Sequence, residues 1–387
     1  MKWEQVRLGD VTDSCLGKML DKEKNRGDYQ PYLANVNVRW GEFDLSDLSE
    51  MRFDAHEQER YGIKYGDIIV CEGGEPGRCA IWKEQIPNMK IQKALHRIRT
   101  HDCLDYRYLF YWFFYSGKRG VFEQYITGAT IKHLPGDKLK SIIIDMPPLV
   151  YQKRIADILT AYDNLIENNQ KQIKLLEEAA QRLYKEWFVD LRFPGHETTP
   201  IVAGVPEGWK KKKLIDIADI QYGYAFDGSL FSTDKSGTPI VRIRNIPTGN
   251  TNDYTSEIAD EQYLVYNGDI VVGMDGEFHI NTWCGKTAYL VQRTCRIEPK
   301  QENTKGWLLQ AIFSPIKYYE KTIVGATVAH LGKKHLDSIE LLVGTENLYI
   351  PFQNIFEKRQ ILLNQNNELK EARDRLLPKL MNGEIEV

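Results

Sequence analysis

The chain has 387 residues, of which 42% are hydrophobic, 11% aromatic and 27% charged, a composition that is typical of globular domains and excludes a disordered or fibrous chain. Its formal net charge is −3, so the total charge does not favour nucleic-acid binding, and any DNA contact has to come from a local basic patch. No apolar run approaches the roughly 18 residues of a membrane span, the first residues lack the apolar core of a signal peptide, and the six cysteines form no C-x-x-C pair, so we expect a cytoplasmic protein.

Residues 1–148 are expected to form a first lobe of short strands and aromatic-rich helices. We interpret the run 31–41 as a strand that ends in a glycine turn, and the run 65–70 as a turn that leads into a buried strand. A further turn at 128–134 precedes the last strand of the lobe, and a Pro-Pro pair ends that strand.

A long helix over 149–193 is expected to follow this lobe. Its apolar positions alternate by four and three residues, which is the spacing of a coiled-coil seam with one polar position, Asn169. At about 1.5 Å per residue, the seam is roughly 50 Å long. The seam positions are Ile155, Leu159, Tyr162, Ile166, Asn169, Ile173, Leu176, Ala180, Leu183 and Trp187.

A linker at 194–206, marked by proline, glycine and threonine, separates this helix from a second lobe at 207–343. A second long helix is expected at 350–384, where the seam spacing recurs in weaker form. The junction before it lacks the Pro-Pro pair of the first junction, which leaves the start of the second helix less well defined. Its seam positions are Leu362, Asn366, Leu369, Arg373, Leu376 and Leu380.

The two halves of the chain repeat one another. The matching runs occur in the same order, while the loops between them vary in length. Asn37 in the first half corresponds to Asn245 in the second. Such an ordered set of matches indicates a tandem duplication of one unit, a lobe followed by a helix. The runs are 31–41 with 239–249, 65–70 with 267–272, 128–134 with 325–331, and 176–179 with 369–372.

Two seams of similar length in one chain favour packing of the two helices against each other, and homodimerisation through the same seams is the alternative. In both arrangements the helices act as a ruler that fixes the distance between two similar lobes. The predicted fold class is therefore α+β, a tandem repeat of two globular α/β domains that are each followed by a long helix.

Several motifs, taken together and in order, carry a family resemblance. They are the lobe opening 3–10, echoed at 208–216, the loop 66–77, the first junction 147–155, the helix segment 176–188 and the chain end 369–385. In these motifs the chain resembles the specificity subunit of type I restriction–modification systems, over nearly its whole length.

The resemblance implies two target recognition domains and an antiparallel coiled coil formed by the two helices. Each domain would read one half of a bipartite double-stranded DNA target, and the helices would set the spacer and dock two methyltransferase subunits. Restriction and translocase subunits would join the full complex. The resemblance also implies a non-catalytic subunit that holds no cofactor of its own, with S-adenosylmethionine, ATP and Mg bound by its partners.

Candidate DNA contacts combine side chains of fixed hydrogen-bonding geometry with turns or basic runs. Arginine and lysine suit guanine, asparagine suits adenine, and a basic side chain neutralises phosphate. By alternation we expect Arg242 and Arg244 on one face of a strand. Solvated strand faces, an ordinary hairpin arginine and a structural turn are the alternatives. The candidates are Asn37, Arg39, Trp40, Arg78, Lys90, Lys93, Thr130, Lys132, His133, Lys210, Lys211, Arg242, Arg244 and Asn245.

Two other classes of function compete with a recognition subunit. A self-sufficient methyltransferase or nuclease would need motifs that are missing: the run 145–149 lacks the spacing and aromatic residue of a methyltransferase motif, and no Pro-Asp pair occurs. The recognition subunit of a combined restriction and methylation enzyme is a related alternative that the sequence leaves open. A coiled-coil scaffold for protein partners explains the seams but not the two similar lobes. We expect no metal site, because Cys284, Cys295, His330 and His335 have the wrong spacing for a zinc finger.

Overall fold

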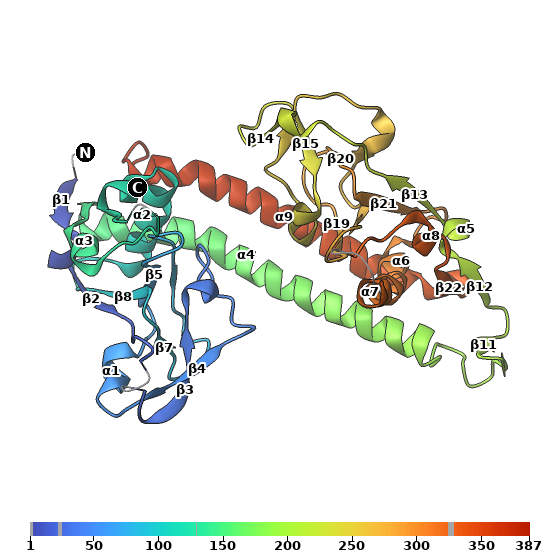
Figure 1. The fold of residues 1–387 in the computed structure, drawn as a ribbon, viewed down its shortest axis with the longest axis horizontal. Helices are drawn as coiled ribbons and strands as arrows, with labels where there is room; N and C mark the ends of the chain where they lie inside the picture. The colour runs from blue at the N-terminus through green and yellow to red at the C-terminus, as the bar shows by residue number, and fades with distance from the viewer. Residues whose placement is uncertain (1–2, 22–24, 129, 324–328) are drawn as a thin grey trace. The chain divides into compact units, whose positions relative to one another are not determined.

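The computed structural model describes residues 3–21, 25–128, 130–323 and 329–387. The chain forms two compact units, of which unit 1 is Met1–Asn164 with Lys370–Val387 and unit 2 is Leu165–Leu369. Each unit contains one lobe and a part of each of two long helices, α4 (Leu149–Tyr184) and α9 (Ile350–Met381) (Figure 1). Among the described residues, no helix is both long enough and apolar enough to cross a membrane.

The first lobe is built on two small sheets and a strand pair. The antiparallel sheet has the order β2 (Thr12–Leu16), β8 (Leu95–Thr100), β5 (Ile68–Cys71) and β6 (Cys79–Ile81). The second sheet has the order β4 (Ser49–Phe53), β3 (Asp28–Leu33) and β7 (Lys90–Ile91). In it, β3 and β7 are parallel. The start and end of the lobe pair as β1 (Glu4–Arg7) and β9 (Ile143–Met146).

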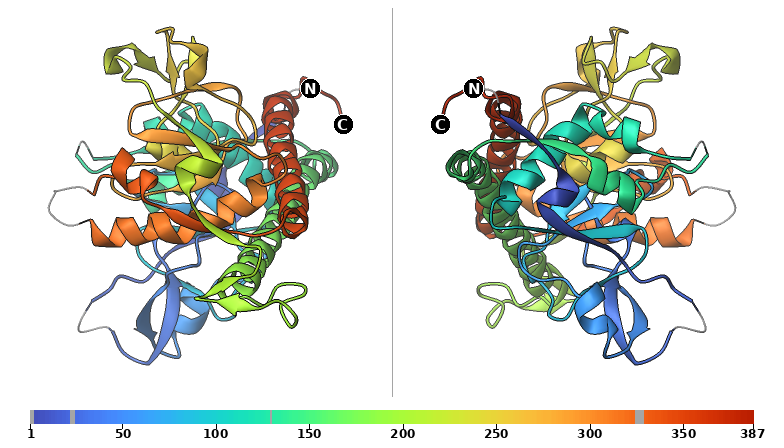
Figure 2. Two further views of the ribbon diagram at one scale, coloured as in Figure 1. Left: turned by 90° about the vertical axis from the view of Figure 1, so that its right-hand side faces the viewer. Right: turned by 90° about the vertical axis from the view of Figure 1, so that its left-hand side faces the viewer.

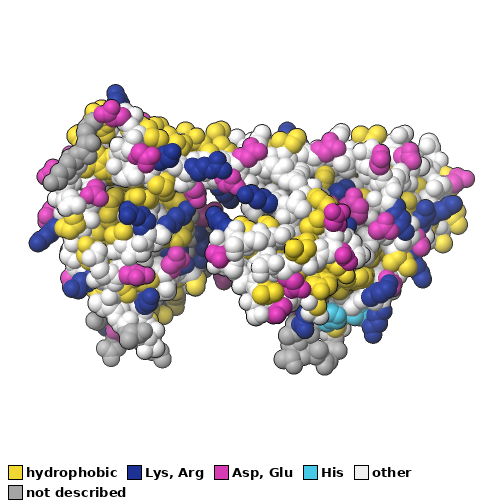
Figure 3. Space-filling view, turned by 90° about the horizontal axis from the view of Figure 1, so that it is seen from above, with side chains coloured by type: hydrophobic (Ala, Val, Ile, Leu, Met, Phe, Trp, Pro, Cys, Tyr) yellow, Lys and Arg dark blue, Asp and Glu magenta, His cyan; other side chains and the backbone are white. Residues whose placement is uncertain are grey.

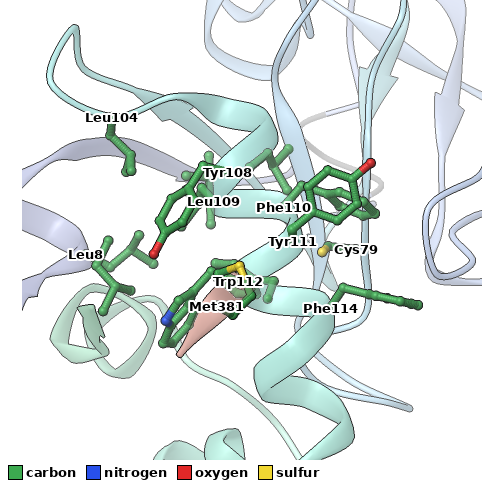
Figure 4. Packing of buried hydrophobic residues seen from close by; sticks show 14 of the residues in the cluster. Leu8, Cys79, Leu104, Tyr108, Leu109, Phe110, Tyr111, Trp112, Phe114 and Met381 are labelled. Atoms are coloured by element: carbon green, nitrogen blue, oxygen red, sulfur yellow. The ribbon is translucent and has the colours of Figure 1, made fainter. Parts of the chain in front are cut away.

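The helix α2 (Tyr106–Lys118) fills the core of the first lobe with aromatic side chains. Figure 4 shows Tyr108 and Trp112 of this helix packed with Leu8 and Met381, so both ends of unit 1 in the sequence contribute to one core. The Tyr108 hydroxyl donates a hydrogen bond to the backbone oxygen of Asp145 over 2.6 Å, which satisfies its polar end inside this core. The short helices of the lobe are α1 (Glu57–Tyr61) and α3 (Gly136–Ser141).

Asp105 caps the start of α2 and gives a prediction for stability. Its carboxylate accepts hydrogen bonds from the backbone nitrogens of Arg107 over 2.8 Å and Tyr108 over 3.3 Å. Asp105→Ala leaves these two donors without a partner, and we expect the free energy of unfolding to fall by about 1–2 kcal/mol. Asp105→Asn keeps a capping oxygen and should recover most of the loss in urea unfolding. Equal losses in the two variants would contradict the capping role.

The second lobe repeats the four-stranded order of the first and the three central strands of its second sheet, to which it adds one strand at each edge. Its antiparallel sheet runs β13 (Ala218–Tyr222), β21 (Thr294–Pro299), β18 (Ile270–Gly273) and β19 (Ile280–Thr282). Its second sheet runs β14 (Phe231–Ser232), β16 (Tyr254–Thr255), β15 (Thr238–Val241), β20 (Ala288–Leu290) and β17 (Leu264–Val265), with β15 and β20 parallel. The lobe begins and ends in the pair β12 (Lys210–Lys213) and β22 (Glu340–Val343). The helices are α5 (Leu214–Ile217), α6 (Lys305–Ala311), α7 (Phe313–Thr322) and α8 (Lys333–Asp337).

The helices α4 and α9 lie side by side and run antiparallel within each unit (Figure 1, Figure 2). In unit 1, Arg373 of α9 donates to Asp163 of α4 over 2.5 Å, and in unit 2, Arg359 donates to Glu177 over 2.7 Å. The residue numbers of the partners therefore fall along α9 as they rise along α4, which is the pattern of an antiparallel pair. The buried seam of α4 keeps the spacing read from the sequence, at Ile155, Leu159, Ile166, Asn169, Ile173 and Ala180.

Across the seam, the Asn169 amide donates to Gln365 Oε1 over 3.5 Å, so the polar seam position has a partner on the other helix. The two seams pack within one chain, and homodimerisation is not required to bury them. The predicted fold class, a duplicated lobe-and-helix unit with an antiparallel helix pair, is confirmed.

Two details of the helices and the linker differ from the sequence interpretation. The α-helical part of the first helix ends at Tyr184, short of 193, because a π-helical turn at Lys185–Val189 follows it. In that turn Phe188 packs into the core of unit 2, and Arg192 doubles back to pair with Glu186 over 2.5 Å. The stretch 194–206 also contains a small hairpin, β10 (Ile201–Val202) with β11 (Val205–Pro206).

Candidate nucleic-acid interface

The paired asparagines of the repeat, Asn37 and Asn245, hold their own turns in shape. Asn37 is buried, accepts a hydrogen bond from the backbone nitrogen of Ala34 over 2.8 Å, and donates to the backbone oxygens of Asp44 and Asp47. Asn245 accepts from the backbone nitrogen of Arg242 over 2.8 Å in the same way. Their amides are used inside the lobes, which supports a structural role for both residues.

The prediction that Arg242 and Arg244 share one face of a strand is wrong. The strand β15 ends at Val241, and Ile243–Thr248 forms a 3₁₀-helix whose start is fixed by the Asn245 side chain. The corresponding turn in the first lobe is the 3₁₀-helix Asn35–Asn37, after β3 has ended at Leu33. Strand alternation therefore does not apply at these positions.

The two arginines of this 3₁₀-helix have different surroundings. Arg244 remains 60% exposed at its side chain and forms an ion pair with Asp253, which raises the pKa of Arg244. Burial alone would raise the pKa of Asp253, but hydrogen bonds from Arg244 and Asn245 outweigh it and the pKa is lowered. The guanidinium of Arg242 lies over the ring of Phe231, 5.4 Å from its centroid. Arg244 is therefore both exposed and held in one orientation.

In the first lobe, Arg39, Trp40 and Arg78 surround one loop. Arg78 donates to Asn35 Oδ1 over 2.7 Å and pairs with Glu75, so it braces the loop against the 3₁₀-turn. The Trp40 indole nitrogen donates to Glu75 Oε1 over 2.7 Å. Arg39 is exposed and donates to the backbone oxygen of Val36. Of these three, Arg39 presents the most exposed charge.

The lysine candidates differ in how well they can reach a phosphate. Lys90 is buried and donates to the backbone oxygen of Asn88 over 2.8 Å, and burial lowers its pKa. Lys90 therefore does not present its charge at the surface, which a phosphate contact would require. Lys93 is half-buried. Lys210 and Lys211 are exposed on β12, as are Lys212 and Lys213.

The turn that contains Thr130, Lys132 and His133 presents all three side chains at the surface. It precedes α3 and not the last strand directly. The backbone of His133 pairs with Gly73 in the loop after β5. Residues 325–328 of the matching run in the second half, and Ala129 of the first, lie outside the described residues. The described part shows the same pairing, of His330 with Asp275.

A hollow of about 490 Å³ opens in the second lobe beside this pairing. Sequence reasoning did not single out most of the residues that line it. A comparison of the two repeats, position by position, would have identified them, because Asp275 and Arg293 occupy the positions of Gly73 and Ala94 in the first lobe. Its lining residues are Tyr222, Gly223, Met274, Asp275, Gln292, Arg293, Thr294 and His330. Figure 3 shows histidine and basic side chains gathered on one face of unit 2.

No group of three or more histidine, cysteine or acidic side chains suited to a metal ion occurs among the described residues. Cys295 is buried in the core, and burial raises the pKa of its thiol to about 12. A thiol with so high a pKa stays protonated and is a poor metal ligand.

Comparison with known proteins gives one consistent set of matches. The family model described as "Type I restriction modification DNA specificity domain" matches residues 1–178 and 206–343, which covers both lobes. The MjaIX specificity subunit of a type I restriction enzyme from Methanocaldococcus jannaschii is 27% identical, over 83% of this chain and 78% of its own length. The MjaVIII specificity subunit from the same organism is 26% identical, over 100% of this chain and 93% of its own length.

A solved structure supports the fold independently. The S subunit of a type I restriction–modification system from M. genitalium superposes with a TM-score of 0.55 at 17% identity, over 98% of this chain and 96% of that one. At such low identity, the likeness concerns the arrangement of the chain alone.

Proposed function

Since this chain belongs to the type I restriction modification DNA specificity domain family, we propose that it works as the DNA sequence-specificity subunit of a type I enzyme in which each lobe reads one half of a bipartite target. The observation that carries the proposal is the duplication itself. Two lobes with the same four-stranded sheet order and the same three central strands in the second sheet occur in one chain, and each is joined to the same pair of helices. A duplicated reader suits a target with two separated parts.

The two lobes offer different side chains on matching backbone, which supports an asymmetric target. Gly73 in the loop after β5 corresponds to Asp275 in the loop after β18, and Ala94 of the first lobe corresponds to Arg293 of the second. Base recognition depends on the donors and acceptors presented to the groove edge. Two lobes that differ at such positions would therefore prefer different half-sites.

We assign the chemistry of the complex to partner subunits. Methyltransferase subunits would dock on the antiparallel helices and bind S-adenosylmethionine, and restriction and translocase subunits would use ATP and Mg. The chain itself would be non-catalytic and would act in the cytoplasm, where the DNA lies. The names of the relatives, which are specificity subunits, support this division of work.

The proposal is tested by adding the purified chain to its methyltransferase partner and mapping the methylated adenines on a DNA library. We expect two short specified segments separated by a spacer of fixed length, and no methyl transfer by the chain alone. Methyl transfer by the chain alone would place it among combined enzymes. Methylation without sequence preference in the presence of the partner would refute the proposal.

A matched deletion in both helices tests their role as a ruler. The variant lacks residues 166–172 of α4 and residues 363–369 of α9. We expect the antiparallel seam to stay in register, because each deletion is one heptad. The helix pair loses about 10 Å at 1.5 Å per residue, so the preferred spacer should shorten by about three base pairs at 3.4 Å each. A library with varied spacers measures the change. If both half-sites keep their sequence and their spacing, the helices do not set the spacer.

A further inference from the structure

The hollow in the second lobe brings together loops that are far apart in the sequence. The loop after β18 contributes Asp275, the turn before β21 contributes Arg293, and the segment before α8 contributes His330. The hydroxyl of Tyr222, which also lines the hollow, is buried and has no hydrogen-bond partner among the described residues. The hollow therefore contains an unused polar group beside a set of charged and polar side chains.

The backbone around the hollow is the same in the two lobes. Met274 donates from its backbone nitrogen to the oxygen of Arg293 over 2.8 Å, and Glu72 donates to the oxygen of Ala94 over 2.8 Å in the first lobe. Leu331 donates to the oxygen of Met274 over 2.7 Å, as Leu134 does to Glu72. The duplicated scaffold thus holds three loops in place, and the side chains on them are free to differ.

One of the positions that differ is occupied by Ala94 in the first lobe and by Arg293 in the second. Ala94 and Arg293 both have the left-handed backbone conformation, with φ of +90° and +71°. This conformation is disfavoured for residues other than glycine, and strain of this kind tends to persist at functional sites. The Arg293 side chain gains little from packing, because it is 62% exposed. Because Ala94 has the same conformation, the turn belongs to the shared scaffold, and what the second lobe adds to it is an exposed arginine.

Asp275 fixes the orientation of its two neighbours. Its carboxylate is only 11% exposed, and it pairs with Nη1 of Arg293 through one oxygen and with Nδ1 of His330 through the other, the latter over 2.5 Å. Because Nδ1 of His330 faces the carboxylate, Nε2 is the nitrogen left for another partner. Arg293 keeps further N–H donors beyond the one that Asp275 accepts.

We propose that Arg293, oriented by Asp275 and accompanied by His330, reads the edge of a guanine in the half-site bound by the second lobe. This assignment rests on the proposed function of the chain as a DNA-specificity subunit. Guanine presents two acceptors, O6 and N7, in the major groove, and an oriented arginine matches them. A phosphate contact is less suitable here, because the buried carboxylate of Asp275 balances the charge of Arg293 and would repel a phosphate.

The test compares variants within the complete complex of this chain with its methyltransferase partner. Each complex is titrated with duplexes in which every base pair of the half-site is replaced in turn. We expect Arg293→Ala to reduce discrimination about 10- to 100-fold at one G·C pair of one half-site and to leave the other half-site unchanged. Asp275→Asn should weaken the same discrimination, because the arginine loses its orienting partner.

Two controls separate base reading from folding and from charge. Arg293→Gly and Arg293→Ala both lose the ion pair with Asp275, but glycine also relieves the left-handed strain, so the melting temperature of Arg293→Gly should exceed that of Arg293→Ala while the discrimination is lost in both. Lys334→Ala removes another exposed cation of the second lobe and should leave the base preference unchanged. A uniform loss of affinity with a salt slope reduced by about one would instead identify a phosphate contact, and an unchanged base preference would remove Arg293 from the reading surface. Absence of any sequence preference in the wild-type complex would refute the proposed function itself.

Discussion

Replacement of Arg359 by alanine should lower the free energy of unfolding of the chain by about 3 kcal/mol. Arg359 is only 8% exposed, and its guanidinium donates to Glu177 on α4, to Thr282 Oγ1 over 2.6 Å and to Asn281 Oδ1 over 2.8 Å. Its removal leaves Glu177 and Thr282 Oγ1 without this donor in a largely buried network, while Asn281 Oδ1 still accepts from the backbone nitrogen of Thr282 over 2.8 Å. Breaking a buried ion pair from one side costs about 3–5 kcal/mol, and the 42% exposure of the Glu177 side chain places the loss near the lower end of that range.

Chemical unfolding followed by circular dichroism measures this loss. Arg375→Ala is the matched control on the same helix, because its ion pair with Glu371 is exposed at both partners and should contribute less than about 1 kcal/mol. Arg359→Lys keeps the charge but not the branched set of donors, and we expect an intermediate result. Similar midpoints for Arg359→Ala and Arg375→Ala would show that the network does not hold α9 against the second lobe.

Gly17→Ala and Gly223→Ala should each lower the free energy of unfolding by about 3 kcal/mol, and the physical reason is the same in the two lobes. A Cβ atom at Gly17 would lie 2.4 Å from the backbone oxygen of Gln92, and one at Gly223 would lie 2.1 Å from that of Val291. Backbone cannot move aside as a flexible side chain does, so the strands must shift, and overpacking of this kind typically costs about 1–3 kcal/mol or somewhat more. Each glycine directly follows the first strand of its central sheet, β2 or β13.

Gly228→Ala is the control for both substitutions, because no other atom lies within 4 Å of the position of its added Cβ. Thermal unfolding of the three variants should show two large losses and one small change. Full stability of Gly223→Ala would contradict the close backbone approach, and a large loss in Gly17→Ala alone would show that the two lobes are built differently at this point.

The sequence was most informative where a pattern extended over many residues. The seam of α4 could be predicted because alternation by four and three residues reflects the geometry of the helix and needs no knowledge of the lobes. The duplication could be predicted from four short runs. The need for glycine at Gly17 and Gly223 could not be predicted from the sequence, because it depends on which backbone segment passes close to each residue.

Individual side chains were much harder to assign. Asn37 and Asn245 are candidate base contacts in the sequence, and in the structure both hold turns together. The sequence does not separate these two roles, because an asparagine that caps a turn looks the same there as one that faces DNA. Lys90 is a candidate DNA contact in the sequence, and its side chain is buried. The alternation expected at Arg242 and Arg244 failed because their strand ends sooner than expected and a 3₁₀-helix follows.

Ion pairs between the two long helices favour the pairing of α4 with α9. The carboxylates of Asp163 and Glu177 stand on α4, and their arginine partners, Arg373 and Arg359, both stand on α9, two heptads apart in each helix. If α4 met a second copy of itself, Asp163 and Glu177 would have neither of these arginine partners. The two ion pairs therefore favour contact between an α4 and an α9 helix over contact between two α4 helices.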